Sequence, residues 1–230
     1  MDSDTNRLER QISLIGIENT QKLCQSSVAV FGIGGVGGYA VEALARCGIG
    51  KIIVIDFDTI SISNINRQII ADTTTVGKTK TDAIAERIKK INPDCEVIRK
   101  NIFIDKSNAG EIIGSEKVDY VIDAVDNVSA KIAIIEYCKH NNIGIVSCMG
   151  TGNKLDPTRF KITDISKTSV CPLAKVIRHE LKIRGIKKVD VLFSDEEPVR
   201  TGKRVPASIA FVPSVAGMLL ARHVVLKIIE

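Results

Sequence analysis

The sequence predicts an α/β fold, Rossmann-like and doubly wound, with a mostly parallel sheet and a C-terminal antiparallel and helical extension. Two observations lead to this prediction: a glycine-rich loop between an apolar run and a helical pattern in residues 28–47, and short apolar runs that alternate with helical patterns as far as residue 152. Alternating strands and helices are typical of a parallel sheet covered on both faces. A chain of 230 residues suits one such domain, residues 1–230, with a nucleotide-binding core over 7–152 and an extension over 153–230.

The first strand, glycine loop and helix predict a phosphate-binding corner. Residues 28–31 are apolar, residues 37–47 show a helical pattern, and glycines at 32, 34, 35, 37 and 38 lie between or overlap them. Glycine permits a tight turn and a close approach of the backbone to an anion, and a helix start offers unpaired N–H groups. We therefore expect Gly32, Gly34, Gly35 and Gly37 to bind a nucleotide. A second strand over 51–56 ends in Asp56, 19 residues past Gly37, which suits a carboxylate that holds ribose hydroxyls.

The remaining elements follow from periodicity and from Gly and Pro breaks. An amphipathic helix from Arg7 to Gly16 and a short helix at 19–24 precede the first strand. A polar loop at 58–66 leads to a helix over 79–91 that stops at Asn92-Pro93. The core continues with strands at 96–101, 120–123 and 143–149 and a helix at 129–140. The extension has a strand near 157–163, a helix at 172–184, a strand at 189–193, a polar loop at 194–207 and a final helix within 211–229.

The final helix is apolar enough to suggest a membrane span, but Arg222, His223 and Lys227 interrupt it and Pro213 lies near its start. We expect a packed amphipathic helix and no membrane span. The first seven residues contain no apolar run of the signal-peptide type, so we expect a cytoplasmic protein.

Six cysteines are present and none forms a Cys-x-x-Cys pair. This pattern argues against a zinc ribbon and against a disulfide framework, and most of the cysteines are expected to be small buried side chains. Cys171 leaves two interpretations open, a buried hydrophobic residue or a reactive thiol.

Positive charge is concentrated in the second half of a chain whose net charge is +5. A solvated helix face and a nucleic-acid surface are both compatible with such a run. Its members are Arg178, Lys182, Arg184, Lys187, Lys188, Arg200, Lys203 and Arg204.

The polar residues after Asp56 favour nucleotidyl transfer over hydride transfer. Arg67 and Lys80 beside a glycine loop would neutralise a triphosphate, and Asp126 after the strand at 120–123 would hold Mg²⁺. This set of residues suits attack on the α-phosphate of a nucleotide with pyrophosphate as the leaving group. A dinucleotide cofactor for hydride transfer needs little fixed positive charge near its phosphates. The competing interpretation makes Arg67 and Lys80 surface charges and Asp126 the cap of the following helix.

Six motifs resemble those of the ubiquitin-activating enzymes and the bacterial sulfur-carrier adenylyltransferases of the ThiF, HesA and MoeB type. The motifs are Arg7-Leu-Glu-Arg-Gln-Ile, Gly32-Ile-Gly-Gly-Val-Gly, Asp56-Phe-Asp-Thr-Ile, Ser63-Asn-Ile-Asn-Arg-Gln, Gly77-Lys-Thr-Lys and Asp123-Ala-Val-Asp-Asn. The resemblance implies that ATP and Mg²⁺ are the cofactors.

The same resemblance implies roles for individual residues. Asp56 would hold the ribose, Arg67 and Lys80 the phosphates, and Asp126 the Mg²⁺, while Arg10 would reach into the neighbour's site in a homodimer. Arg67, Lys80, Asp126 and Arg10 are thus the expected catalytic residues; Asp58, Asn64, Gln68 and Asn127 complete the expected nucleotide site.

The second half resembles the tRNA threonylcarbamoyladenosine dehydratases in residues 156–168, 172–178, 191–194 and 207–217. This likeness implies ATP-dependent cyclisation of the modified adenosine in tRNA through adenylation of its threonyl carboxylate. Lys182, Lys187 and Lys188 would then contact the tRNA backbone. The chain departs from the family pattern at Cys47, and its 194–207 loop is short.

Three other functions compete with this interpretation. The first is an adenylyltransferase without zinc that activates the C-terminal Gly-Gly carboxylate of a ubiquitin-like sulfur carrier. The second is a scaffold that binds ATP and presents a partner such as a cysteine desulfurase, although the retained set of Asp56, Arg67, Lys80 and Asp126 argues against it. The third is a nicotinamide oxidoreductase.

Overall fold

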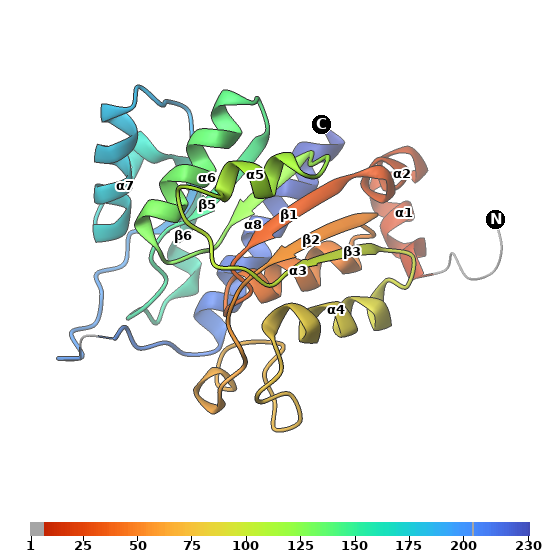
Figure 1. The fold of residues 1–230 in the computed structure, drawn as a ribbon, viewed down its shortest axis with the longest axis horizontal. Coiled ribbons are helices and arrows are strands. Elements are labelled where there is room, and N and C mark those ends of the chain that lie inside the picture. The colour runs from red at the N-terminus through yellow and green to blue at the C-terminus, as the bar shows by residue number, and fades with distance from the viewer. Residues whose placement is uncertain (1–6, 204) are drawn as a thin grey trace.

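A seven-stranded sheet runs through the middle of the molecule in the computed structural model, which describes residues 7–203 and 205–230 (Figure 1). The strand order is β3-β2-β1-β4-β5-β7-β6, and only β6 is antiparallel to its neighbour. The predicted fold class is confirmed. The strands are β1 (Ser27–Phe31), β2 (Lys51–Ile55), β3 (Glu96–Lys100), β4 (Tyr120–Asp123), β5 (Gly144–Cys148), β6 (Phe160–Asp164) and β7 (Asp190–Ser194).

Helices cover both faces of the sheet because side chains along each central strand alternate between two apolar cores. Val28 and Val30 of β1 pack toward α3, α4 and α8, whereas Ala29 and Phe31 pack toward α5, α6 and α7. The helices are α1 (Glu9–Ile15), α2 (Ile17–Gln25), α3 (Gly37–Arg46), α4 (Lys80–Ile91), α5 (Ala109–Gly114), α6 (Val128–His140), α7 (Pro172–Ile183) and α8 (Phe211–Ile229).

One helix of the core, α5, was not predicted. Its six residues contain two glycines, Gly110 and Gly114, and are too short for a helical period to be visible. A Cβ at Gly110 would lie 2.8 Å from Tyr137 Cδ2 on α6. The glycines therefore let the Tyr137 ring pack closely on α5, and this tertiary contact stabilises a segment whose local sequence does not favour a helix.

The apolar composition of α8 is explained by its packing. By length and composition α8 is the one helix among the described residues that could cross a membrane, which is weak evidence for a span. Val212, Ala216, Leu220 and Val224 are at most 1% exposed and belong to the core. Gly217 lets α8 approach α3 so closely that an added Cβ would overlap the carbonyl oxygen of Val36. These contacts agree with the predicted packed helix.

Candidate active site

A cavity of about 540 Å³ opens at the carboxyl edge of the sheet, between the loops that follow β1, β2 and β4. This edge is where open α/β sheets bind ligands, because loops leave neighbouring strands in opposite directions there. The structure brings ten of the predicted site residues to the cavity wall: Gly32, Gly34, Asp56, Asp58, Asn64, Arg67, Gln68, Lys80, Asp126 and Asn127.

Gly35 and Gly37, also predicted to bind the nucleotide, are not among the residues that line the cavity. They shape the turn instead. A Cβ at Gly37 would overlap the carbonyl oxygen of Gly32, and a Cβ at Gly35 would lie 3.2 Å from Pro213 Cβ of α8. Gly32 itself has φ +85° and passes so near Ala124 that a Cβ would lie 2.7 Å from the Ala124 oxygen.

Asp56, at the end of β2, is held in place by backbone donors. Its Oδ2 accepts from Ile33 N at 2.6 Å, and its Oδ1 accepts from Asp58 N at 2.8 Å. The first bond ties the end of β2 to the glycine loop after β1. Each carboxylate oxygen can accept more than one hydrogen bond, so Asp56 keeps capacity for ligand hydroxyls in the cavity.

Lys80 reaches the same wall from the start of α4. Its Nζ lies 2.5 Å from Asp58 Oδ2 and 3.6 Å from Asp56 Oδ1, and the residue is only 6% exposed. The two carboxylates hold the buried Lys80 ammonium group in position at the cavity wall.

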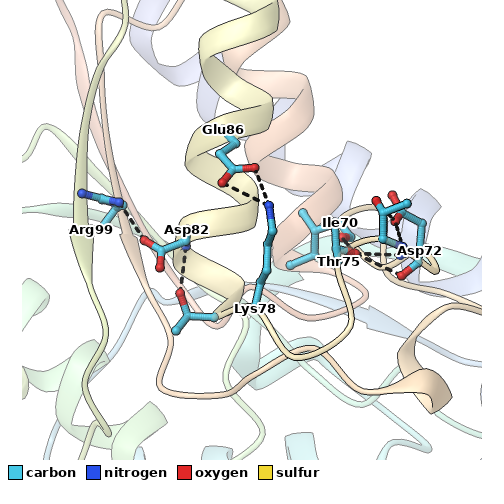
Figure 2. Close-up of polar contacts among 9 residues, drawn as sticks. Ile70, Asp72, Thr75, Lys78, Asp82, Glu86 and Arg99 are labelled. Carbon is cyan, nitrogen blue, oxygen red and sulfur yellow. Dashed lines mark hydrogen bonds and ion pairs between the residues drawn. The ribbon is translucent and has the colours of Figure 1, made fainter.

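The start of α4 is anchored by backbone and side-chain contacts. Lys80 N donates to Asp58 O at 3.0 Å, and the Thr79 side chain caps the helix by accepting from Asp82 N. Figure 2 shows Lys78 paired with Glu86 along α4, and Asp82 bound to Arg99 of β3. Lys78 is therefore directed along the outside of the helix, two residues from a lysine that lines the cavity.

The loop after β2 contributes three more predicted residues. Arg67 donates from Nη1 to Ser63 O at 2.7 Å, and Asn64 Oδ1 accepts from Ser61 N at 3.1 Å. Gln68 is 7% exposed, and its Oε1 is buried with no hydrogen-bond partner among the described residues. An unpaired buried acceptor is costly, so a donor on a bound ligand would stabilise this side chain.

The structure separates the roles of Asp126 and Asn127. Asn127 caps α6, because its Oδ1 accepts from Ala130 N at 3.0 Å and from Ser129 Oγ at 2.9 Å. The capping interpretation of Asp126 is therefore wrong. Asp126 is exposed, and its side chain makes no hydrogen bond or ion pair within the described part of the chain. This leaves the Asp126 carboxylate available to a ligand or metal at the cavity.

A magnesium ion fits this wall only together with a nucleotide. Within residues 7–203 and 205–230, no group of three or more His, Cys, Asp or Glu side chains could hold a metal. Mg²⁺ usually binds through one or two carboxylates and substrate phosphates and keeps several waters. Asp126 meets the protein's share of that requirement.

Two features of the site were not predicted. The first is an apolar wall of Ile102, Phe103 and Phe57, in which the two phenyl rings meet edge to face with centroids 4.9 Å apart. Phe57 and Phe103 are 53% and 50% exposed, so flat apolar surface is available for a purine ring. The sequence offered one signal for this wall, the aromatic residue Phe57 between the two expected site residues Asp56 and Asp58.

The second is a buried ion pair beneath the cavity. Asp123, the last residue of β4, is fully buried; its Oδ2 accepts from Lys131 Nζ at 2.8 Å and from Ser147 Oγ at 2.5 Å. Lys131 Nζ also donates to Cys148 O at 2.9 Å. The network joins β4, α6 and β5 directly under the loop that carries Asp126.

Arg10 lies away from this cavity. It is an exposed residue of α1, which with α2 precedes β1 and so lies at the amino edge of the sheet (Figure 1). The structure does not bring Arg10 to the site of its own chain, and its role in a neighbour's site stays a prediction.

The cysteines are mostly buried, as expected. Burial raises the pKa of Cys95 to about 11 and the pKa values of Cys138 and Cys148 to about 12, so these thiols are protonated at neutral pH. Cys171 is 4% exposed at the N-cap of α7, which favours the buried-residue interpretation.

Comparison with known proteins assigns the family. The family model described as "ThiF family" matches residues 8–230. The chain belongs to the ThiF family. The predicted resemblance is thereby confirmed.

Relatives within the family extend over nearly the whole chain. The tRNA threonylcarbamoyladenosine dehydratase of Bacillus subtilis is 43% identical over 243 residues, covering 98% of this chain and 95% of the relative. The crystal structure of the Escherichia coli enzyme of that name, TcdA, in complex with ATP has a TM-score of 0.93 at 37% identity, covering 99% of this chain and 96% of that one. Ubiquitin-like modifier-activating enzyme 5 of Arabidopsis thaliana is 37% identical, over only 59% of this chain and 35% of its own length.

Proposed function

We propose that this ThiF-family chain is an ATP-dependent dehydratase that cyclises N6-threonylcarbamoyladenosine in tRNA. One observation carries the proposal: Asp56, Arg67, Lys80 and Asp126 line one cavity of about 540 Å³ at the carboxyl edge of the sheet. The near full-length likeness to the dehydratases of Bacillus subtilis and Escherichia coli supports this substrate over a carrier protein.

The proposed reaction has two steps. A threonyl carboxylate oxygen attacks the α-phosphorus of ATP, and the bond to pyrophosphate breaks. A nitrogen of the substrate's own ureido group then attacks the activated carbonyl carbon and loses its proton, AMP leaves, and a five-membered ring closes with net loss of water. Because the nucleophile belongs to the substrate, proximity lowers the barrier to the second step, and no enzyme thiol is required.

The chain's own residues bind and orient the nucleotide. Asp56, fixed by Ile33 N and Asp58 N, holds the ribose hydroxyls, and the Phe57–Phe103 wall accepts the purine. Lys80 and Arg67 stabilise the negative charge that develops on the phosphates during attack. Lys80 is paired with Asp58 at 2.5 Å, so nucleotide phosphates compete with this carboxylate for the ammonium group.

Mg²⁺ would be held by Asp126 together with phosphate oxygens, and it would offset phosphate charge during adenylation. The Asp126 carboxylate is available for this because Asn127 caps α6.

The test is mass spectrometry of nucleosides from tRNA that carries threonylcarbamoyladenosine, after incubation with the protein, ATP and Mg²⁺. We expect an ATP-dependent loss of one water from that nucleoside and one AMP released per product. In Arg67→Ala and Lys80→Ala, turnover should fall by about 10²–10³-fold, the usual effect of losing one group that stabilises transition-state charge.

Lys78→Ala is the matched control, because Lys78 is two residues from Lys80 but pairs with Glu86 outside the cavity. Equal AMP release by wild type, Arg67→Ala and Lys80→Ala would reject the proposed phosphate contacts. An unchanged nucleoside despite ATP binding by the wild type would instead favour the carrier-protein adenylyltransferase.

The proposal includes a cytoplasmic homodimer in which Arg10 serves the partner's site, since Arg10 is exposed and lies at the opposite sheet edge from its own cavity. Mixing Arg10→Ala with Lys80→Ala protein tests this point: partial recovery of activity in mixed dimers is expected if the site is shared. A cysteine desulfurase system as a further partner stays a prediction, and its role would lie outside the proposed reaction, which itself transfers no sulfur.

A further inference from the structure

The buried side chains under the loop that carries Asp126 have no role in the proposed reaction. Lys131 Nζ lies 2.8 Å from Asp123 Oδ2, and Ser147 Oγ donates to the same oxygen at 2.5 Å. All three side chains are 0% exposed. The ammonium group also donates to Ser147 Oγ at 3.3 Å and to Cys148 O at 2.9 Å, so each of its three N–H groups has an acceptor. We call Asp123, Lys131 and Ser147 the buried network.

Stability alone does not account for a charge at position 131. A buried ion pair gains little over an apolar pair of the same volume, because each charge loses its hydration. The neighbours of Lys131 in α6 include Ile132, Ile134 and Ile135, which are at most 6% exposed, so an apolar side chain would suit this part of the core. The lysine is better explained by the groups that it holds in place.

The loop over residues 124–126 begins at a fixed point. Asp123 is the last residue of β4, and its Oδ1 accepts from Val125 N at 3.2 Å. Ala124 N donates to Phe31 O at the end of β1, at 2.8 Å. The first two residues of the loop are therefore bound to Asp123 and to the neighbouring strand.

The loop ends at the start of α6, which the same lysine anchors. Asn127 caps this helix, and one turn later Lys131 N donates to Asn127 O at 3.0 Å. Because the Lys131 ammonium group returns to Asp123, it ties the start of α6 to the end of β4 across the loop. Its bond to Cys148 O adds the end of β5 to this anchor. One buried cation thus fixes both ends of the backbone that carries Asp126.

We propose that the buried network positions Asp126, so that its carboxylate meets the Mg²⁺ of a bound nucleotide without rearrangement. Within residues 7–203 and 205–230 no side-chain contact orients Asp126, so its direction is set by its backbone. Groups that orient a metal ligand strengthen metal binding although they do not touch the metal. Lys131 is therefore a positioning residue. The inference rests on the proposed function, from which it takes Asp126 as the Mg²⁺ ligand.

The basic residues of the second half are separate from this network. Lys182, Lys187 and Lys188 are exposed at the C-terminal end of α7 and in the turn before β7, and Arg204 lies outside the described residues. Their contacts with tRNA stay predictions. Binding of ATP and Mg²⁺ in the absence of tRNA therefore tests the network without involving these residues.

The experiment is calorimetric titration of ATP into the full chain, in EDTA and at a series of Mg²⁺ concentrations. Lys131→Met removes the cation of the buried network. The matched control is Arg87→Met, which also removes a cationic partner from a buried carboxylate. That carboxylate is Glu42, whose Oε2 accepts from Arg87 Nε at 2.6 Å, and neither residue lines the cavity.

For Lys131→Met we expect the Mg²⁺ concentration that half-maximally tightens ATP binding to rise about tenfold, as when a group that orients a metal ligand is lost. The Kd for ATP in EDTA should stay that of wild type. Lys131→Met/Asp126→Asn should show the same Mg²⁺ dependence as Asp126→Asn, because no carboxylate is left to position. Ser147→Ala keeps both charges and should shift the Mg²⁺ dependence in the same direction by a smaller factor, which keeps the test available if Lys131→Met does not fold. Arg87→Met should match wild type.

Three results would each overturn the inference: an unshifted Mg²⁺ dependence in Lys131→Met and Ser147→Ala, an equal shift in Arg87→Met, or a further shift when Lys131→Met is added to Asp126→Asn. Any of them can occur in an active dehydratase, so the proposed function would survive. A wild type that gives the expected nucleotide results but removes no water from the modified nucleoside would overturn the proposed function and leave the positioning role standing.

Discussion

The buried Asp123–Lys131 pair allows a quantitative prediction. Both side chains are 0% exposed, and Lys131 Nζ lies 2.8 Å from Asp123 Oδ2. At this separation, with an effective dielectric constant of about 20, the Coulomb attraction is about 6 kcal/mol. Lys131→Met removes it, while Asp123 keeps its bonds from Ser147 Oγ and Val125 N. Since the variant no longer has to desolvate an ammonium group, we expect a net loss of about 3–5 kcal/mol in the free energy of unfolding.

Urea denaturation followed by circular dichroism measures this loss. A decrease of about 4 kcal/mol lowers the unfolding midpoint by about 1 M or more, for a typical denaturant dependence. Asp123→Asn in the Lys131→Met background removes the orphaned charge and should recover part of the stability. A loss below about 1 kcal/mol in Lys131→Met, or a double variant as unstable as the sum of the single changes, would refute the assigned role of the pair.

Two further predictions concern Asp126 and His223. Asp126→Asn should raise the Mg²⁺ concentration needed for half-maximal AMP release. Asn127→Ala is the control: it should lower the free energy of unfolding by about 1 kcal/mol, because it removes the α6 cap, and leave the Mg²⁺ titration unchanged. Identical Mg²⁺ titrations for Asp126→Asn and wild type would exclude Asp126 as a ligand. Burial lowers the pKa of His223 from its ordinary 6.5, outweighing the Asp190 carboxylate 3.3 Å away. The unfolded chain therefore binds a proton more readily, and this contribution to stability is present above about pH 6.5 and lost as the pH falls below it. Urea midpoints between about pH 5 and 8 should decline toward acid more steeply for wild type than for His223→Gln; parallel curves would contradict the assignment.

The sheet and the edge that holds the cavity could be predicted because their signals are local. Apolar runs mark β1, β2, β4 and β5, and the residues that follow parallel strands meet at one edge whatever the details of packing. That is why Asp56, Lys80 and Asp126, far apart in the chain, were expected together and line one cavity.

The missed features depend on contacts between distant segments. Helix α5 is stabilised by Tyr137 packed against its glycines. The lysine within the apolar sequence of α6, Lys131, is explained by its buried contacts with Asp123 at the end of β4 and with Cys148 O of β5. The choice between Asp126 and Asn127 as helix cap could not be made from sequence, because both residue types are good caps. The backbone decides it by giving Asn127 the extended conformation of an N-cap.

The glycine loop after β1 packs against α8, so two segments far apart in the sequence are in contact. Pro213 lies within contact distance of the Gly35 position, and Gly217 lets α8 touch the first turn of α3. If nucleotide binding rigidifies the loop, the amide hydrogens of α8 should exchange more slowly in its presence, although α8 does not line the cavity. Such coupling would be reciprocal: if nucleotide binding changes the affinity of α8 for a ligand by some factor, that ligand changes the affinity for the nucleotide by the same factor. Contacts made on α8, which does not line the cavity, would in that case change how tightly the active site binds its nucleotide.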